Sequence, residues 1–153
     1  MRLGSLLGVS SLGCTLALTP ASLPGQQAET EPEIHYLAVA TFHVPFNDDR
    51  AKVLWWIDSV MVPTNKMNPD VLSFRMGNHI YGSRGGDMIL MTEYADWPAI
   101  NADCEPCSAW FENRQPAEGT PERETWDEAL AMFLKYFTGH HDEIYTINMA
   151  RAK

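Results

Sequence analysis

The segment Ile34–Val44, with the sequence IHYLAVATFHV, constrains the fold more than any other part of this chain. It is rich in β-branched and aromatic residues and is followed by Pro45, a pattern typical of a β-strand. Because alternate side chains of a strand point to opposite faces, Leu37 and Val39 lie on one face and Phe42 on the other. Both faces are largely apolar. We therefore expect a central strand in a sheet that is covered on both sides.

A long amphipathic helix and a final strand are predicted near the C-terminus, within Thr120–Met149. Thr120 and Pro121 are typical of a helix start, and Gly139 is typical of the residue that follows a helix end. After a Gly-His-His hinge, the strand is expected from Glu143 to Met149. Large apolar residues recur at steps of four, three and four and so share one helix face: Trp126, Leu130, Phe133 and Phe137. This face must be buried, and the sheet is the surface that can bury it.

The middle of the chain predicts two more helices and two more strands. They are a helix from Asp48 to Val62, strands Val71–Tyr81 and Asp87–Tyr94, and a helix from Asp96 to about Phe111. The first helix is expected to stop at Val62 because Pro63 follows it. Gly82–Gly86 reads as the turn of a hairpin between the two strands.

This order of elements predicts an α+β fold, a ferredoxin-like β-α-β-β-α-β sandwich with an extra helix before the last strand. Its helices would cover one face of a four-stranded antiparallel sheet. The other face would be bare and apolar, so we expect a second copy of the chain to cover it, sheet against sheet. Trp55 and Trp56 are adjacent and cannot share a helix face. One of them is expected outside the intrachain core, either packed by its neighbours or at a subunit interface.

The element order, the strands that are apolar on both faces, and the final helix followed by Gly-His-His and DEIYTIN resemble the dimeric α/β-barrel superfamily. The resemblance covers about Ile34 to Met149. The superfamily consists of ferredoxin-like domains, among them monooxygenase-like and stress-responsive-barrel-like proteins. That superfamily contains cofactor-free monooxygenases, haem-degrading and haem-dependent enzymes, small isomerases and domains without assigned activity. The resemblance implies a dimeric α/β barrel with a cavity between sheet and helices. It implies no subfamily and no particular catalytic residue.

The N-terminal segment has the three-part pattern of a secretory signal peptide. Arg2 supplies a positive charge, an uncharged apolar run follows, and small residues allow cleavage after Ala21. Cleavage before Cys14, with a lipid attached to it, is the alternative. Residues 22–33 are rich in Pro, Gln and Glu and are expected to be a flexible lead-in to a domain spanning residues 34–153. The expected location is therefore periplasmic or extracellular.

Composition excludes some partner classes. The chain has 153 residues with a hydrophobic fraction of 45%, enough for one domain with a proper core. Its formal net charge of -9 argues against a nucleic-acid partner, which needs a basic surface. The same charge argues against adsorption on anionic membranes, so no membrane partner is expected unless Cys14 is lipidated.

The pattern Cys104-Glu105-Pro106-Cys107 is the sharpest local motif. In an exported protein it reads as a structural disulfide or inert thiol pair, as half of a metal site, or as a redox pair. A redox role is disfavoured because we expect the motif within a late helix, where a disulfide would also strain a regular helix. His140 and His141 could complete a zinc site with the two cysteines. Alternatively, the two histidines interact with the helix C-terminus and the nearby acidic residues. No cofactor is predicted, with zinc as the possible exception.

Polar residues within the apolar strands are the remaining candidates. His43, Arg75 and Glu93 could converge at one end of the sheet, where His43 would act as a general base or orient a ligand and Arg75 would stabilise an anionic oxygen. The alternative is that they point to solvent, or that Arg75 and Glu93 form a cross-strand ion pair. His35 is also a polar residue in an apolar strand.

Three functional hypotheses follow from the sequence. The leading one is an exported homodimer that binds a small apolar molecule in its cavity, without assigned catalysis. The second is a small cofactor-free oxidoreductase of the monooxygenase type that uses His43 and Arg75. The third is a metal-binding module built from the cysteine pair and the histidine pair.

Overall fold

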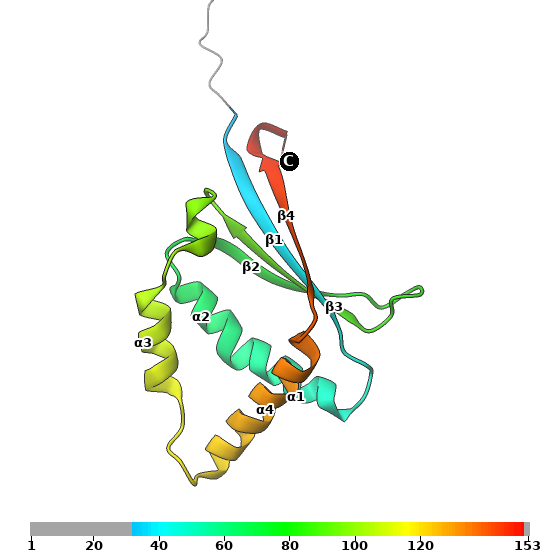
Figure 1. The fold of residues 1–153 in the computed structure, drawn as a ribbon, viewed down its shortest axis with the longest axis vertical. Helices are drawn as coiled ribbons and strands as arrows, with labels where there is room; N and C mark the ends of the chain where they lie inside the picture. The colour runs from blue at the N-terminus through cyan, green and yellow to red at the C-terminus, as the bar shows by residue number, and fades with distance from the viewer. Residues whose placement is uncertain (1–31, 152–153) are drawn as a thin grey trace, which may run out of the picture. The chain divides into compact units, whose positions relative to one another are not determined.

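The computed structural model describes residues 32–151 (Figure 1). The predicted signal segment, Cys14 and residues 22–31 of the lead-in lie outside the described residues. Within residues 32–151, the helices are too short or too polar to cross a membrane.

A four-stranded antiparallel sheet forms one layer of the domain (Figure 1). Its strands are β1 (Ile34–His43), β2 (Val71–Asn78), β3 (Asp87–Tyr94) and β4 (His141–Asn148). They lie in the order β2-β3-β1-β4, so β1 and β3 are central and β2 and β4 are edges. This is the strand order of the ferredoxin-like split β-α-β fold. The α+β fold prediction is therefore confirmed, and β1 is central as its two apolar faces predicted.

The helices pack against one face of the sheet and enclose the core (Figure 1). They are α1 (Asp48–Trp56), α2 (Val62–Met67), α3 (Glu105–Arg114) and α4 (Pro121–Phe137). The sheet contributes Phe42, Met88 and Leu90 to the core, and the helices contribute mainly valine and aromatic side chains, including Val53 and Trp56. The prediction for the adjacent tryptophans is confirmed, since Trp56 is buried and Trp55 is 36% exposed.

The last helix forms as predicted. The Thr120 hydroxyl accepts a hydrogen bond from the backbone N–H of Arg123 at 3.2 Å, which caps the helix start. Gly139 follows the helix end with φ 86°, a conformation that favours glycine. The predicted apolar face lies on the core, where its rings contact those of β1 and α1: Trp126 and Phe133 are buried, and Leu130 and Phe137 pack beside them.

The prediction that the first helix stops at Val62 is wrong. The helix passes through a π-helical turn, Ile57–Met61, and continues as α2, with Pro63 in its first turn. In a regular helix, the proline ring would clash with the carbonyl group four residues earlier, and its missing N–H would leave that group unbonded. The wider π turn immediately before Pro63 changes this hydrogen-bond pattern, so the chain continues as a helix.

The prediction of one helix from Asp96 to Phe111 is also wrong. A short 3-10 turn, Pro98–Asn101, is followed by Ala102, which is extended with ψ 139°. The Asp96 carboxylate accepts a hydrogen bond from the backbone N–H of Ala99 in this turn at 2.9 Å. Helix α3 then begins after Cys104. Pro106 accounts for the break, because in a continuous helix it would face the carbonyl group of Ala102 without an N–H to donate.

The hairpin between β2 and β3 is longer than predicted, because β2 ends at Asn78 and not at Tyr81. Its exposed part carries Ile80 and Tyr81, which are 79% and 89% exposed. Gly86 closes the hairpin with φ 98° and donates its N–H to the carbonyl of His79.

The sheet face opposite the helices, called the outer face here, carries the odd-numbered residues of β1 and their neighbours in register. Its apolar members are half-buried or exposed: Leu37, Val39, Ile89, Met91, Tyr145 and Ile147. No segment among residues 32–151 forms a second layer over this face in Figure 1.

Candidate functional site

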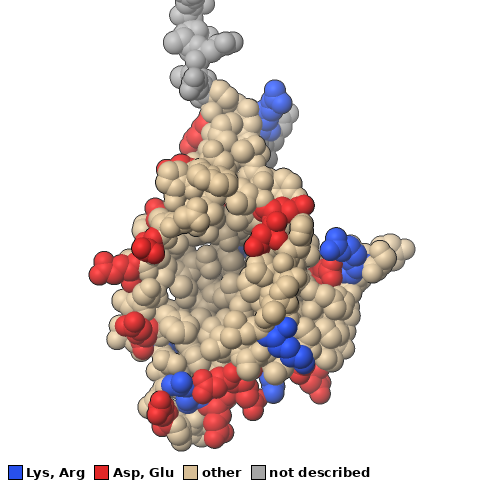
Figure 2. Space-filling view, viewed as in Figure 1, with Lys and Arg blue, Asp and Glu red and all other residues tan. Residues whose placement is uncertain are grey.

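A cavity of about 310 Å³ lies between the helix-covered face of the sheet and the helices. Figure 2 shows the surface hollowed in the middle of the view, and the atoms within the hollow belong to uncharged residues. The apolar lining comes from strands and helices far apart in the sequence: Ala38, Ala40, Phe74, Leu90, Ile144, Met61, Ile100 and Phe137. The position agrees with the cavity that the sequence resemblance implied.

Two small side chains in the centre of β1 make room for this cavity. Ala38 and Ala40 point to the same face as Phe42, which is buried in the core. Larger residues at these two positions would fill the space between β1 and α2. The lining residues were not identified from the sequence, although two alanines at alternate positions of an apolar strand are a signal for such a space.

Polar groups lie at one side of the cavity. Asn65 lines it and donates a side-chain hydrogen bond to the carbonyl of Met61 at 2.9 Å. On β4, Asp142 is paired with Ala40 and shares its face of the sheet, so its carboxylate, on a side chain that is 64% exposed, lies at the rim. The side chain of the next residue, Glu143, points to the outer face, where a hydrogen bond from the Tyr145 hydroxyl lowers the pKa of its carboxyl. The acidic rim favours neutral or cationic ligands over anions.

His140 connects the end of α4 to this rim. Its ring stacks on Phe137 with centroids 3.8 Å apart, and its Nε2 is hydrogen bonded to Asp142 at 2.8 Å. The Nδ1 atom is hydrogen bonded to the carbonyl of Phe137 at 2.8 Å. These contacts fix the positions of the Phe137 ring and the Asp142 carboxylate beside the cavity.

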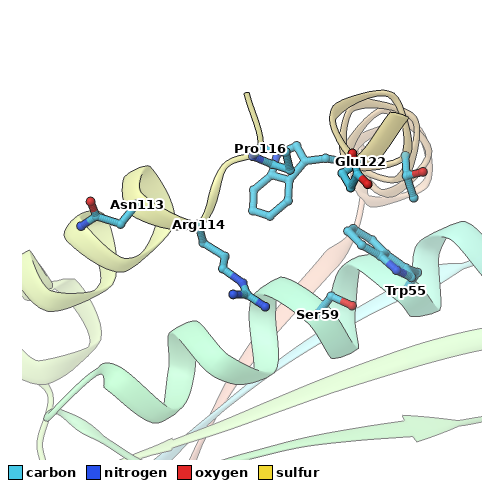
Figure 3. A pocket seen from close by; sticks show the side chains of 8 residues that line it. Trp55, Ser59, Asn113, Arg114, Pro116 and Glu122 are labelled. Atoms are coloured by element: carbon cyan, nitrogen blue, oxygen red, sulfur yellow. The ribbon is translucent and has the colours of Figure 1, made fainter. Parts of the chain in front are cut away.

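A second groove, of about 500 Å³, lies between α1, the end of α3 and the start of α4 (Figure 3). Trp55 and Ser59 form its floor, and Arg114 reaches toward them from α3. Glu122 lies on the opposite wall, on α4. This groove was not predicted from the sequence, because the three segments that form it are distant along the chain.

The structure does not bring His43, Arg75 and Glu93 together at one end of the sheet. In the register of β1 and β3, His43 lies opposite Asp87, whereas Glu93 lies opposite Leu37. His43 and Leu37 are six residues apart on β1, a separation of about 20 Å along a strand. None of the three residues lines the cavity. The monooxygenase hypothesis therefore loses the residues that it named.

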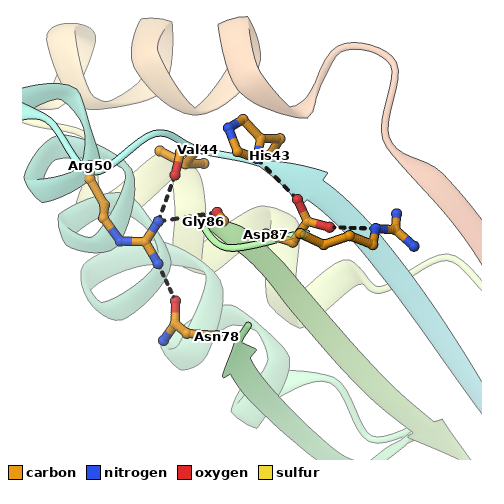
Figure 4. A network of polar contacts seen from close by, with 7 residues as sticks. His43, Val44, Arg50, Asn78, Gly86 and Asp87 are labelled. Atoms are coloured by element: carbon orange, nitrogen blue, oxygen red, sulfur yellow. Dashed lines mark hydrogen bonds and ion pairs between the residues drawn. The ribbon is translucent and has the colours of Figure 1, made fainter. Parts of the chain in front are cut away.

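His43 has a structural environment at the base of the hairpin (Figure 4). Its Nδ1 is hydrogen bonded to Asp87 at 3.0 Å, and Asp87 also pairs with Arg84 at 2.9 Å. Beside this group, Arg50 donates hydrogen bonds to the carbonyls of Val44 at 2.7 Å and Gly86 at 3.2 Å (Figure 4). These bonds tie the hairpin to the start of α1.

Glu93 belongs to a separate network on the outer face. It accepts hydrogen bonds from Ser73 at 2.9 Å and from His35 Nδ1 at 2.8 Å, and Arg75 acts on it only through its charge. The hydrogen bond to Glu93 raises the pKa of His35, and a second bond, to Glu33, adds to the shift. The hydrogen bond from His35 lowers the pKa of Glu93. The two shifts have the same origin, because the pair is strongest when the imidazole is protonated and the carboxyl is ionised.

The structure does not bring the cysteine and histidine pairs together. Cys104 and Cys107 form a disulfide with each other at the start of α3. His140 pairs with Asp142 and His141 lies 3.5 Å from Glu143. Residues 32–151 contain no group of three or more His, Cys, Asp or Glu side chains arranged to hold a metal ion.

The sequence matches no protein-family model, and no curated protein matches it. Among solved structures, the chain is similar to protein SO0527 from Shewanella oneidensis, with a TM-score of 0.45 and 11% identity over 75% of this chain and 92% of that one. It is similar to a putative antibiotic biosynthesis monooxygenase from Caulobacter crescentus, with a TM-score of 0.42 and 13% identity over 76% of this chain and 90% of that one.

A dimeric protein of unknown function with a ferredoxin-like fold from Bacteroides fragilis gives a TM-score of 0.40 and 8% identity, over 76% of this chain and 95% of that one. Of these neighbours, one is thus described as dimeric with a ferredoxin-like fold and another as a monooxygenase. The fold of the present chain is assigned from its own strand order and strand directions.

Proposed function

We propose that this protein is an exported homodimer that binds a small, mainly apolar molecule in the cavity between the sheet and helices α2 and α4. The observation that carries the proposal is the space of about 310 Å³ beside Ala38 and Ala40, with its largely apolar walls. Ligand pockets in proteins have volumes from about 300 Å³ upward and walls of this kind. The volume suits a compound with one or two rings.

The polar groups of the cavity restrict the ligand further. Asp142 places negative charge at the rim, so a neutral or cationic compound is favoured and an anion is disfavoured. Asn65 and Thr92 supply the uncharged hydrogen-bonding groups of the lining. A neutral ring system with one polar substituent fits these features best.

The outer face supports the homodimer. Half-buried apolar residues such as Val39 and Met91 lie next to each other in its centre. A contiguous apolar sheet face requires a cover, and an identical face on a second copy satisfies that requirement by two-fold symmetry. Export rests on the N-terminal signal pattern and agrees with a disulfide, which persists in oxidising compartments.

Titration with N-phenyl-1-naphthylamine, a neutral apolar fluorophore, tests the cavity. We expect saturable binding that Ala40→Leu weakens at least about tenfold, because the added side-chain atoms occupy ligand space. Ala131→Leu on the exposed face of α4 adds the same atoms outside the cavity and serves as the control. If the probe does not bind, or binds both variants as tightly as the wild type, the cavity is not the binding site.

A further inference from the structure

We propose that the Cys104–Cys107 disulfide is redox-active and oxidises cysteine pairs of polypeptides. The sequence disfavoured this role because the motif was expected inside a helix. The structure places it differently, since Cys104 is the N-cap residue of α3 and Cys107 lies in its first turn. The pair therefore occupies the start of a ten-residue helix, where backbone N–H groups are not bonded within the helix.

The helix start favours a thiolate on Cys104. The backbone N–H of Cys107 points at Cys104 Sγ, with the two atoms 3.2 Å apart. When the disulfide opens, this donor and the positive end of the helix dipole stabilise negative charge on the same sulfur. Glu105 in the first turn opposes the effect, but its side chain is exposed and screened by water. Cys104 is therefore the better leaving group of the two sulfurs.

A purely structural role gives little reason for this disulfide. It joins residues with a sequence separation of three, so it closes a very short loop. The stabilisation expected from a disulfide increases with the length of the loop that it closes, and a loop this short removes little freedom from the unfolded chain.

The surroundings of the disulfide provide access for a polypeptide. Cys107 lines a surface groove of about 330 Å³ together with Thr64 and Phe111. On the other side of α3, Pro106 and Trp110 line a second groove, of about 450 Å³, whose walls are mainly apolar. Two grooves that flank one disulfide suit the residues on either side of a substrate cysteine better than they suit a small thiol.

The geometry assigns the two sulfurs different roles. A substrate thiolate attacks Cys107 Sγ from the groove, forms a mixed disulfide with it, and breaks the Cys104–Cys107 bond. The electron pair of that bond leaves on Cys104, at the helix start. A second substrate thiolate then attacks the substrate sulfur of the mixed disulfide and releases Cys107. The substrate loses two electrons and two protons and gains a disulfide. Cys104 and Cys107 accept the two electrons and the two protons and become thiols.

A peptide with two cysteines and a fluorophore tests the proposal, using the protein with Cys14→Ser so that no third thiol reacts. We expect one peptide disulfide per protein molecule, formed at least about tenfold faster than with oxidised glutathione at equal disulfide concentration. Mass spectrometry after thiol alkylation then finds both protein cysteines reduced. A rate equal to that of glutathione, or a protein disulfide that stays intact, overturns the proposal.

Two single variants test the assignment of the sulfurs. Cys104→Ser leaves Cys107 beside the groove without its partner sulfur. The mixed disulfide between Cys107 and the peptide should therefore accumulate as a stable adduct. Cys107→Ser removes the attacked sulfur and should form the adduct at least about tenfold more slowly. Circular dichroism checks that both variants are folded, and the wild-type kinetics decide the proposal if either is not. Equal adduct formation by the two variants contradicts the assignment.

Discussion

The substitution Val39→Lys tests whether the outer face is covered by a second copy of the chain or faces solvent. Val39 lies in the middle of β1, paired with Met91 on β3 and with Glu143 on β4. In a monomer, the new ammonium group can pair with Glu143, and an exposed ion pair contributes about 0–1 kcal/mol. We therefore expect the substitution to change the free energy of unfolding of the monomer by less than about 1 kcal/mol.

In a sheet-to-sheet dimer, the same substitution has a large effect. Full burial of a valine side chain contributes about 1.5–3 kcal/mol, and most of Val39 is already buried within one copy, so each copy loses up to about 1 kcal/mol. Two-fold symmetry counts the loss twice, and each ammonium group also loses hydration, at a cost on the order of several kcal/mol per ion. The sum is at least about 3 kcal/mol per dimer, which raises the Kd of the dimer at least about a hundredfold.

Light scattering coupled to size-exclusion chromatography, followed by sedimentation across a range of concentrations, measures this Kd. Leu134→Lys is the matched control, because it makes the same kind of change at a residue of α4 that is 51% exposed. We expect a dimer for the wild type and the control and a monomer for Val39→Lys. The reasoning is refuted if the wild type is monomeric, or if both variants dimerise with the same Kd.

Three further predictions concern stability, each measured by urea denaturation. The His35–Glu93 pair contributes stability that is lost as pH rises through the raised pKa of His35, whose ordinary value is 6.5, and as pH falls through the lowered pKa of Glu93, whose ordinary value is 4.5. The difference in free energy of unfolding between wild type and His35→Gln should therefore be largest between these ordinary values, and a pH-independent difference contradicts the pairing. Gly86→Ala should lower the free energy of unfolding more than Gly119→Ala does. At Gly119 only the positive φ opposes alanine, at a cost of about 1–2 kcal/mol. At Gly86 φ is also positive, and the added methyl group would lie 3.1 Å from the Val44 carbonyl oxygen. Phe133→Ala should reduce the free energy of unfolding by about 3–5 kcal/mol, since the ring is buried, and a change below about 1 kcal/mol would show that the α4 face is not part of the core.

Local patterns predicted most of the fold. The caps of α4 and its apolar face depend on residues within one segment, so Thr120, Gly139 and Phe133 could be assigned before the structure was known. The two errors in the helices both involve proline. Pro63 was predicted to end a helix, whereas the effect of Pro106 within a predicted helix was missed. In both cases the surrounding structure decides whether the chain widens into a π turn or breaks and restarts.

The candidate site was less predictable because it depends on strand register. Alternation along a strand predicts which face a residue occupies, but not which residue of the next strand lies beside it. The register places His43 next to Asp87 and Glu93 next to Leu37, so an expected cluster became two separate networks. The cavity was predicted only as a feature of the fold, because its lining comes from several segments that no single pattern connects.

The π-helical turn Ile57–Met61 allows one continuous helical segment to contribute side chains to both the core and the cavity wall. A turn of this kind acts like one inserted residue, so it rotates everything that follows by about 100° around the helix axis. Before it, Val53 and Trp56 face the core beside α4; after it, Asn65 faces the cavity. A single-residue deletion in this turn would therefore restore a regular helix and keep Asn65 on the cavity wall, whereas a regular helix of unchanged length would turn Asn65 away from the cavity by about 100°. The ligand site thus depends on a one-residue offset in the backbone as much as on the side chains that line it.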